Sequence, residues 1–242
     1  MREKERIIVA LDVSSLDELA ELVDQLKDCV GMFKIGINLY TRFGPKAVQA
    51  VKKEGAKVFL DLKYNDIPEQ VGGAAKEAGN LGVYFFTVHA SGGARMMVKA
   101  AENKGESKIL AVSVLTSLTR NESVVIYGSL PEFKVIEFAR MAVAVGIEGL
   151  VCSPQELKAL NSEREIFSGF KRLLKVTPGI RPSWAASQDH ARIATPLEAI
   201  KLGADYLVIG RPITRPPKNI GSPRNAAEKI IEEISLFYKA TC

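Results

Sequence analysis

The stretch KVFLDLKYNDIPEQVGGAAKEAGNLGVYFFTVH, residues 57–89, decides the fold. Its apolar runs at 57–62 and 83–89 predict strands, and residues 68–80 between them predict a helix with Pro68 in its first turn. The glycine in LGVYFF is typical of a helix end placed just before a strand. A strand, a helix and a second apolar strand in this order indicate a parallel sheet covered by helices.

The same alternation runs along the whole chain. Further strands are predicted at 6–11, 33–37, 108–114, 148–152, 173–177 and 205–209, and further helices at 15–28, 45–54, 92–104, 132–145, 154–161, 196–202 and 222–239. Eight repeats in 242 residues predict an α/β fold, a (β/α)8 TIM barrel that forms a single domain over residues 1–242. A doubly wound open sheet is the alternative, but no GxGxxG follows the first strand.

The composition is that of an ordinary globular chain. Hydrophobic residues make up 47% and charged residues 25%, and 33 basic against 28 acidic side chains give a net charge of +5. The three cysteines lie far apart, so neither a disulfide framework nor a zinc site is expected. No signal peptide or membrane-spanning run is predicted, and the basic residues stand singly rather than in a nucleic-acid-binding patch. We therefore expect a cytoplasmic protein that binds neither membrane nor nucleic acid.

Charged residues stand where the first three strands end. Side chains of a strand alternate between its two faces, so Asp61 and Lys63 can point the same way, and Lys34 and Asp12 occupy comparable positions on neighbouring strands. Barrel enzymes carry their chemistry at this end, and a packed barrel interior normally prefers Val, Ile and Leu. The sequence favours a charged catalytic cluster, with a salt-bridge network that closes the barrel as the alternative.

Two glycine–arginine loops follow the last two strands. TPGIRP supplies Gly179 and Arg181, and DYLVIGRPIT supplies Gly210 and Arg211. In barrels, the loops after strands 7 and 8 often hold a phosphate, and an arginine fork suits phosphate oxygens. The pattern favours a phosphate site over solvated surface arginines.

These segments also carry a resemblance. VALDV, FKIG, DLKYNDIP, VHASGG, LTS, TPGIRP and DYLVIGRPIT occur in this order over nearly the whole chain. Together they closely resemble the orotidine 5′-phosphate decarboxylase family. The resemblance implies a homodimeric (β/α)8 carboxy-lyase of pyrimidine biosynthesis that converts orotidine 5′-phosphate to UMP and CO₂ without a metal or an organic cofactor.

The resemblance also implies a role for each matching residue. The catalytic array would be Lys63 as proton donor together with Asp61, Lys34 and, from the partner chain, Asp66. The substrate-binding residues would be Asp12 and Lys34 at the ribose, Thr116 at the pyrimidine, the partner's Ile67 lining the site, and Arg181, Gly210 and Arg211 at the phosphate.

One position departs from the family pattern. The loop glutamine that bridges pyrimidine and phosphate in the family falls on His190 here, while Gln188 lies two positions earlier. We assign the role to His190 by position, with Gln188 as the alternative. His89 is expected to be a structural or supporting group, and Trp184 either packs under a lid or lies on the surface.

The expected reaction explains why a lysine stands at the centre. Loss of CO₂ from an unactivated ring carbon leaves a carbanion, which a fixed ammonium group such as Lys63 can stabilise and protonate. A sugar-phosphate decarboxylase or aldolase of the same barrel group is the closest rival, but it needs Mg²⁺ held by a carboxylate where Lys34 stands. A barrel that binds a nucleotide without catalysis is the other rival.

Overall fold

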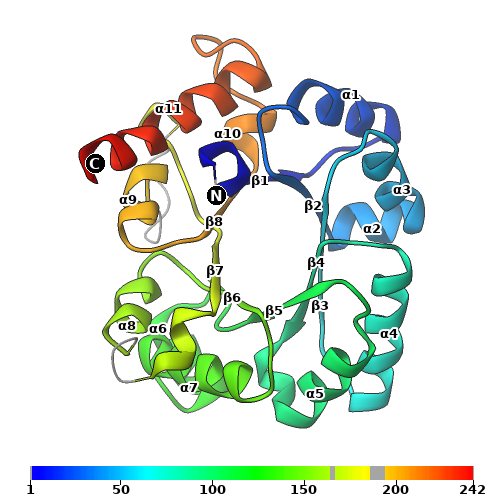
Figure 1. Ribbon diagram of the computed structural model, residues 1–242, viewed down its shortest axis with the longest axis vertical. Coiled ribbons are helices and arrows are strands. Elements are labelled where there is room, and N and C mark those ends of the chain that lie inside the picture. Colours follow the sequence, from blue (N-terminus) through cyan, green and yellow to red (C-terminus); the bar gives the residue numbers. More distant parts are fainter. Residues whose placement is uncertain (1, 164–166, 186–193, 242) are drawn as a thin grey trace.

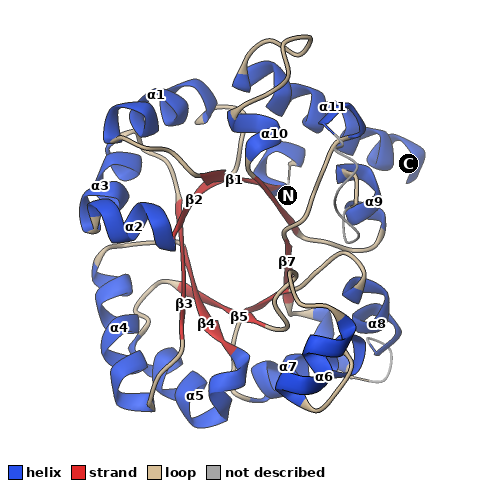
Figure 2. Cartoon of the chain, turned by 180° about the vertical axis from the view of Figure 1, so that it is seen from behind, coloured by secondary structure: helices blue, strands red, loops and turns tan. Residues whose placement is uncertain are grey.

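The computed structural model describes residues 2–163, 167–185 and 194–241. Within these ranges eight parallel strands close into a barrel in chain order, and the last strand pairs back with the first. Figure 1 shows the helices as an outer layer around the barrel, and Figure 2 shows the strands as the inner ring. The predicted (β/α)8 architecture is confirmed.

The strands lie within two residues of the predicted runs. They are β1 (Ile7–Leu11), β2 (Met32–Gly36), β3 (Val58–Tyr64), β4 (Phe85–His89), β5 (Lys108–Val112), β6 (Gly149–Val151), β7 (Leu174–Thr177) and β8 (Tyr206–Ile209).

The helices follow the strands as expected, with several additions. They are α1 (Leu16–Leu26), α2 (Ile37–Phe43), α3 (Pro45–Lys53), α4 (Pro68–Asn80), α5 (Gly93–Asn103), α6 (Arg120–Tyr127), α7 (Pro131–Ala144), α8 (Glu156–Glu163), α9 (Pro196–Lys201), α10 (Arg211–Thr214) and α11 (Pro223–Thr241). Short 3-10 turns, η1 (Glu3–Arg6), η2 (Ala90–Gly92), η3 (Ser168–Lys171) and η4 (Ser183–Ala185), connect some of these elements.

The helices α2, α6 and α10 were not predicted from the sequence. α6 contains the β-branched run Val124, Val125 and Ile126, which has a low helix propensity. The helix is nevertheless fixed at its start, because the Thr119 hydroxyl accepts the Glu122 N–H while the Glu122 carboxylate accepts the Thr119 N–H. The local cap therefore prevails over the residue preference.

Apolar side chains fill the barrel interior. Inward-facing residues from the strands form one buried cluster, in which the Phe85 ring lies edge-on to those of Phe59 and Tyr206, with centroids 5.9 and 5.4 Å away. A larger core lies between the strands and the helices. Because strand side chains alternate, the residues two positions beyond this inner cluster also face inward, at the carboxyl ends of the strands. That alternation carries Lys34, Asp61 and Thr87 to the open end of the barrel.

The length and the polarity of a helix determine whether it can cross a membrane. In the ranges that the structure describes, every helix is too short or too polar to span a membrane.

Candidate active site

Three of the predicted charged residues meet at the carboxyl ends of β2 and β3. The Asp61 carboxylate accepts from Lys63 Nζ at 2.8 Å through one oxygen, and its other oxygen lies 3.2 Å from Lys34 Nζ. The side chains of Asp61 and Lys34 are only 12% and 14% exposed, whereas that of Lys63 is 35% exposed. Gly36 leaves room for the Lys34 ammonium, since a Cβ there would stand 3.2 Å from Nζ. The two ammonium groups thus share one buried carboxylate.

The backbone of β3 is distorted at this cluster. Leu60 pairs with Phe86 and Tyr64 pairs with Val88, so the register shifts between them, and Lys63 adopts a left-handed φ of 55°. Non-glycine residues reach this conformation only when the surroundings impose it. The bulge leaves both Asp61 and Lys63 on the inner side, around one residue of β4.

That residue of β4 is Thr87, which the sequence analysis did not single out. Its buried hydroxyl accepts the Lys63 backbone N–H at 2.8 Å and donates to the Asp61 carboxylate at 3.1 Å. The hydroxyl therefore ties the distorted backbone to the carboxylate. A polar residue within the apolar run VYFFTVH was the available signal.

The electrostatics of Asp61 follow from these contacts. Burial would raise the pKa of its carboxyl, but the charges of Lys34 and Lys63 and their hydrogen bonds outweigh burial, and the pKa falls below its usual value. The carboxylate therefore stays ionised between the two ammonium groups, which it holds close together.

His89 stands at the end of β4, two residues beyond Thr87. Burial, and next the charge of Lys63, lower the pKa of its imidazole, so the ring is neutral near pH 7. Its Nδ1 is buried and has no hydrogen-bond partner among the residues described. These features agree with a supporting position beside the charged cluster.

The two glycine–arginine loops lie at the same end of the barrel. Gly179 has a φ of 77°, and a bridge between Ile180 and Ala194 carries the bond from the Arg181 N–H to the Ala194 carbonyl, 2.9 Å long. Burial, and then the nearby charge of Arg211, lower the pKa of Arg181. Neither guanidinium is in an ion pair within the described ranges, so the structure brings two uncompensated positive charges together.

The other predicted residues lie around this end. Asp12 is exposed beyond β1, and its carboxylate is 3.9 Å from where a Gly210 Cβ would be, although no ion pair joins it to the cluster within the described chain. Thr116 is half-buried after β5. Asp66 and Ile67 are exposed in the β3–α4 loop, where the Asp66 carboxylate accepts the Ile67 N–H at 2.6 Å.

Two positions of the phosphate-side loop, His190 and its alternative Gln188, lie outside the described residues. Trp184 lies within them, in η4. It is half-buried and packs against the outer core, so full surface exposure is excluded.

The sequence of this chain was matched to a family whose members share this barrel. The family model described as "Orotidine 5′-phosphate decarboxylase / HUMPS family" matches residues 5–230. The chain belongs to this family. The expected resemblance is thereby confirmed over nearly the full length of the barrel.

Relatives within the orotidine 5′-phosphate decarboxylase / HUMPS family are close. The chain is 45% identical over 238 residues to a protein of Geotalea uraniireducens named orotidine 5′-phosphate decarboxylase, with 95% of each chain covered. It is 42% identical over 247 residues to one of the same name from Heliobacterium modesticaldum, covering 97% of this chain and 98% of the relative. A crystal structure of orotidine 5′-phosphate decarboxylase from Lactobacillus acidophilus superposes with a TM-score of 0.77 at 33% identity, covering 94% of this chain and 98% of that one.

Proposed function

We propose that this chain is a carboxy-lyase that converts orotidine 5′-phosphate to UMP and CO₂ in pyrimidine biosynthesis. The observation that carries the proposal is the cluster of Lys34, Asp61 and Lys63, in which a buried carboxylate holds two ammonium groups at 3.2 and 2.8 Å. Family membership and relatives that bear this name support it.

Lys63 supplies the proton in this proposal. When the bond between the ring carbon and the carboxylate breaks, CO₂ leaves and the electron pair stays on the carbon. The Lys63 ammonium, held beside that carbon, stabilises the negative charge and then donates a proton to it, and water later restores the ammonium. The greater exposure of Lys63 than of Lys34, 35% against 14%, supports the choice of Lys63 as the lysine that meets the substrate.

Asp61 and Lys34 keep Lys63 in position. A lysine side chain is flexible, and ordering it costs conformational entropy. If its ammonium is fixed before the substrate arrives, this cost does not add to the free energy of the transition state. The Thr87 hydroxyl adds to this order by joining the Lys63 N–H to the Asp61 carboxylate. The two ammonium groups and the carboxylate are therefore in place before the substrate reacts.

The phosphate and the nucleoside would be bound around this cluster. We assign the phosphate to Arg181, Gly210 and Arg211, supported by two neighbouring guanidinium groups whose positive charges a dianion would compensate. Asp12 beside Gly210 is assigned to the ribose together with Lys34, Thr116 to the pyrimidine, and His190 to the bridge between the two. Phosphate binding far from the reacting carbon would help to organise the site.

The reaction is proposed to need neither a metal nor an organic cofactor. Mg²⁺ binds to proteins through one or two carboxylates together with water and substrate oxygens, so a cation beside those carboxylates opposes its binding. Lys34 places a positive charge at the position where the Mg²⁺-dependent rivals carry a carboxylate. This charge favours the metal-free reaction.

We further propose a homodimer in which Asp66 and Ile67 enter the partner's site. Both side chains are exposed, Ile67 by 63%, and Ile37 at the same end of the barrel is 62% exposed. Apolar side chains this exposed are candidates for an interface.

Mixing two inactive variants tests the dimer. A Lys63→Ala chain and an Asp66→Ala chain, each inactive alone, should regain about a quarter of the native activity when subunits exchange, because half of the dimers are mixed and each of these has one intact site. A mixture that stays inactive while chromatography shows mixed dimers would exclude a shared site. The control is each variant alone, taken through the same subunit-exchange procedure, which should stay inactive.

The remaining expectations concern the whole chain. We propose that residues 1–242 form one domain, supported by the closed barrel and its continuous outer core. The free, buried thiols of Cys29 and Cys152 support the expected cytoplasmic location. A single cooperative unfolding transition in urea would support the single domain, and two separated transitions would contradict it.

The activity itself is tested by adding orotidine 5′-phosphate to the purified protein in excess EDTA. We expect its absorbance to change to that of UMP, with one CO₂ released for each UMP formed. Activity that disappears in EDTA and returns with Mg²⁺ would favour the sugar-phosphate rival's chemistry. Tight binding of UMP without any turnover would favour a nucleotide-binding protein.

A further inference from the structure

A second cationic recess lies at the opposite end of the barrel. It has a volume of about 390 Å³ and opens at the amino-terminal ends of β7 and β8, beside Arg6 and under the last turns of α11. Small-molecule sites typically have volumes of about 300–1,000 Å³. The recess therefore has the size of a ligand site, on the same strand pair as Arg181 and Arg211 but away from them.

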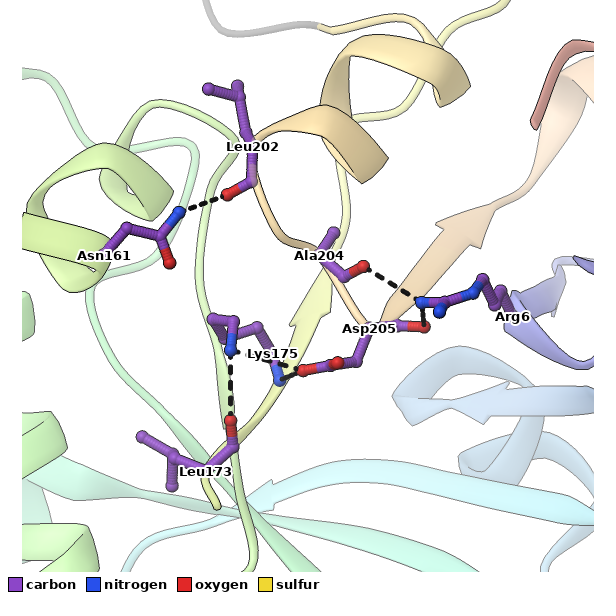
Figure 3. A network of polar contacts seen from close by, with 7 residues as sticks. All are labelled: Arg6, Asn161, Leu173, Lys175, Leu202, Ala204 and Asp205. Carbon is purple, nitrogen blue, oxygen red and sulfur yellow. Dashed lines mark hydrogen bonds and ion pairs between the residues drawn. The ribbon is translucent and has the colours of Figure 1, made fainter. Parts of the chain in front are cut away.

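Lys175 forms the buried wall of this recess. It is 6% exposed, and its Nζ lies 3.4 Å from both the Asp205 carboxylate and the Leu173 carbonyl (Figure 3). Both distances are at the long limit for a hydrogen bond, while an ammonium has three protons to donate. The same Asp205 oxygen accepts the Lys175 backbone N–H at 2.8 Å. The carboxylate is thus held mainly by the backbone, and the ammonium keeps donor capacity.

Arg6 adds a second incompletely paired cation. Its Nη1 donates to the carbonyl oxygens of Ala204 and Asp205, at 3.4 and 3.2 Å, and not to a carboxylate (Figure 3). Its Nε is buried and has no partner in the described part of the chain. A buried donor without an acceptor is costly, so its presence calls for an acceptor beyond those that the described residues supply.

The charge around the recess is strongly unbalanced. The lining side chains include five cations and one carboxylate: Arg6, Lys171, Arg172, Lys175 and Lys201, with Asp205. The three that are exposed at the rim, Lys171, Arg172 and Lys201, form no ion pair within the described ranges. An aromatic wall completes the recess, with the Tyr238 ring centroid 5.4 Å from the Arg6 guanidinium.

We propose that this recess binds a phosphate-bearing anion through Arg6, Lys175 and the rim cations. A phosphate group has several strong acceptor oxygens and about two negative charges, which match a guanidinium fork, a buried ammonium and unpaired lysines. The aromatic wall can take the base of a nucleotide, and the cations alone can take free phosphate. The two sources share the phosphate and are separated by experiment.

The test measures phosphate binding after the carboxyl-end arginines have been removed. Inorganic phosphate is titrated by calorimetry into the Arg181→Ala/Arg211→Ala variant, and we expect it to bind still. Adding Lys171→Ala, Arg172→Ala and Lys201→Ala should weaken that binding more than about tenfold, since several charge-assisted contacts are lost. The matched control removes three other exposed lysines, Lys46, Lys53 and Lys76, from α3 and α4 across the barrel, and should leave binding within about twofold.

Each outcome decides the proposal. No phosphate binding to the Arg181→Ala/Arg211→Ala variant, or an equal loss in the rim variant and its control, would overturn it. If the arginine variant does not fold, the rim changes are made in the wild-type chain. The phosphate site of the recess should then disappear, and the phosphate site of Arg181 and Arg211 should remain. UMP titrated into the arginine variant with and without the rim changes identifies the source: UMP binding that is tighter than phosphate binding and is weakened by the rim changes indicates a nucleotide, and UMP binding that the rim changes leave unaltered indicates the free ion.

Discussion

The two ends of the barrel use the same kinds of side chain in different ways. At the carboxyl end, Lys34 and Lys63 both contact the Asp61 carboxylate, at 3.2 and 2.8 Å. At the amino end, Lys175 is 3.4 Å from the Asp205 carboxylate, and Arg6 bonds to carbonyl oxygens instead. One end pairs its charges closely, whereas the other leaves its cations partly unpaired.

The backbone shows the same contrast. β3 is out of register at the carboxyl-end cluster, with a left-handed φ at Lys63, whereas no non-glycine residue described at the amino ends of β7 and β8 has a positive φ. Strained backbone gathers where function requires fixed groups. We infer that the carboxyl end is built for a reaction that needs preset charges, and the amino end for stability and for holding an anion.

Removing the carboxylate at each end of the barrel should give the largest difference between the two ends. Asp61→Asn leaves the buried Lys34 ammonium and the partly exposed Lys63 ammonium without their shared carboxylate, so we expect a loss of about 3 kcal/mol in the free energy of unfolding. Turnover of orotidine 5′-phosphate should fall by about 10³-fold, since the proton donor is no longer held. Urea unfolding and the absorbance assay measure the two effects.

The matched change at the amino end is Asp205→Asn. The Asp205 side chain is 31% exposed and its nearest ammonium is 3.4 Å away, so the loss should be only about 1 kcal/mol. Equal losses of stability for Asp61→Asn and Asp205→Asn would contradict the distinction between a tightly coupled and a loosely coupled end.

Arg211→Ala should give the next largest effect. Loss of a charged phosphate contact of about 3 kcal/mol corresponds to a fall of about 10²-fold in kcat/KM, although Arg211 is remote from the reacting carbon. Steady-state kinetics on orotidine 5′-phosphate measure it, with Lys46→Ala as a control of equal charge that lies on α3. A near-normal kcat/KM for Arg211→Ala would remove this arginine from the phosphate site.

His89→Asn should give the smallest effect, on the pH dependence of stability. The pKa of His89 is lowered in the folded chain by burial and by Lys63, so below its ordinary value of about 6.5 the unfolded chain binds the proton more readily. Stability contributed by the neutral ring is therefore lost as pH falls. The melting temperature should drop more between pH 7.5 and about 5.5 in the wild type than in His89→Asn, and identical drops would refute this.

Sequence patterns predicted the barrel well because its strands are short, mostly apolar runs that alternate with longer amphipathic helices, several of which begin at a proline. They missed α2 because Ile37–Phe43 directly continues the apolar run of β2. They missed α6 because three β-branched residues suggest a strand, and only the Thr119–Glu122 cap decides otherwise. Local propensity could not decide between the two conformations here.

The meeting of Lys34, Asp61 and Lys63 was predicted from the sequence, but the backbone that brings them together was not. Alternation along β3 correctly put Asp61 and Lys63 on one side, yet it implied a regular strand rather than the shifted register. Thr87 joins the cluster from another strand, and its one trace in the sequence, a polar residue within the apolar run VYFFTVH, does not show which groups its hydroxyl contacts. The amino-end recess depends in the same way on segments that lie far apart in the sequence, at residues 6, 161, 171–175, 200–205 and 237–238.

The Lys63 ammonium is the centre of the proposed reaction, and one measurement tests its role. Wild-type and Lys63→Ala proteins are compared in EDTA for conversion of orotidine 5′-phosphate to UMP, with UMP affinity measured on both by calorimetry. We predict metal-independent turnover in the wild type, no detectable turnover in Lys63→Ala, and measurable UMP binding in both. Turnover by Lys63→Ala at a rate near that of the wild type would contradict the account.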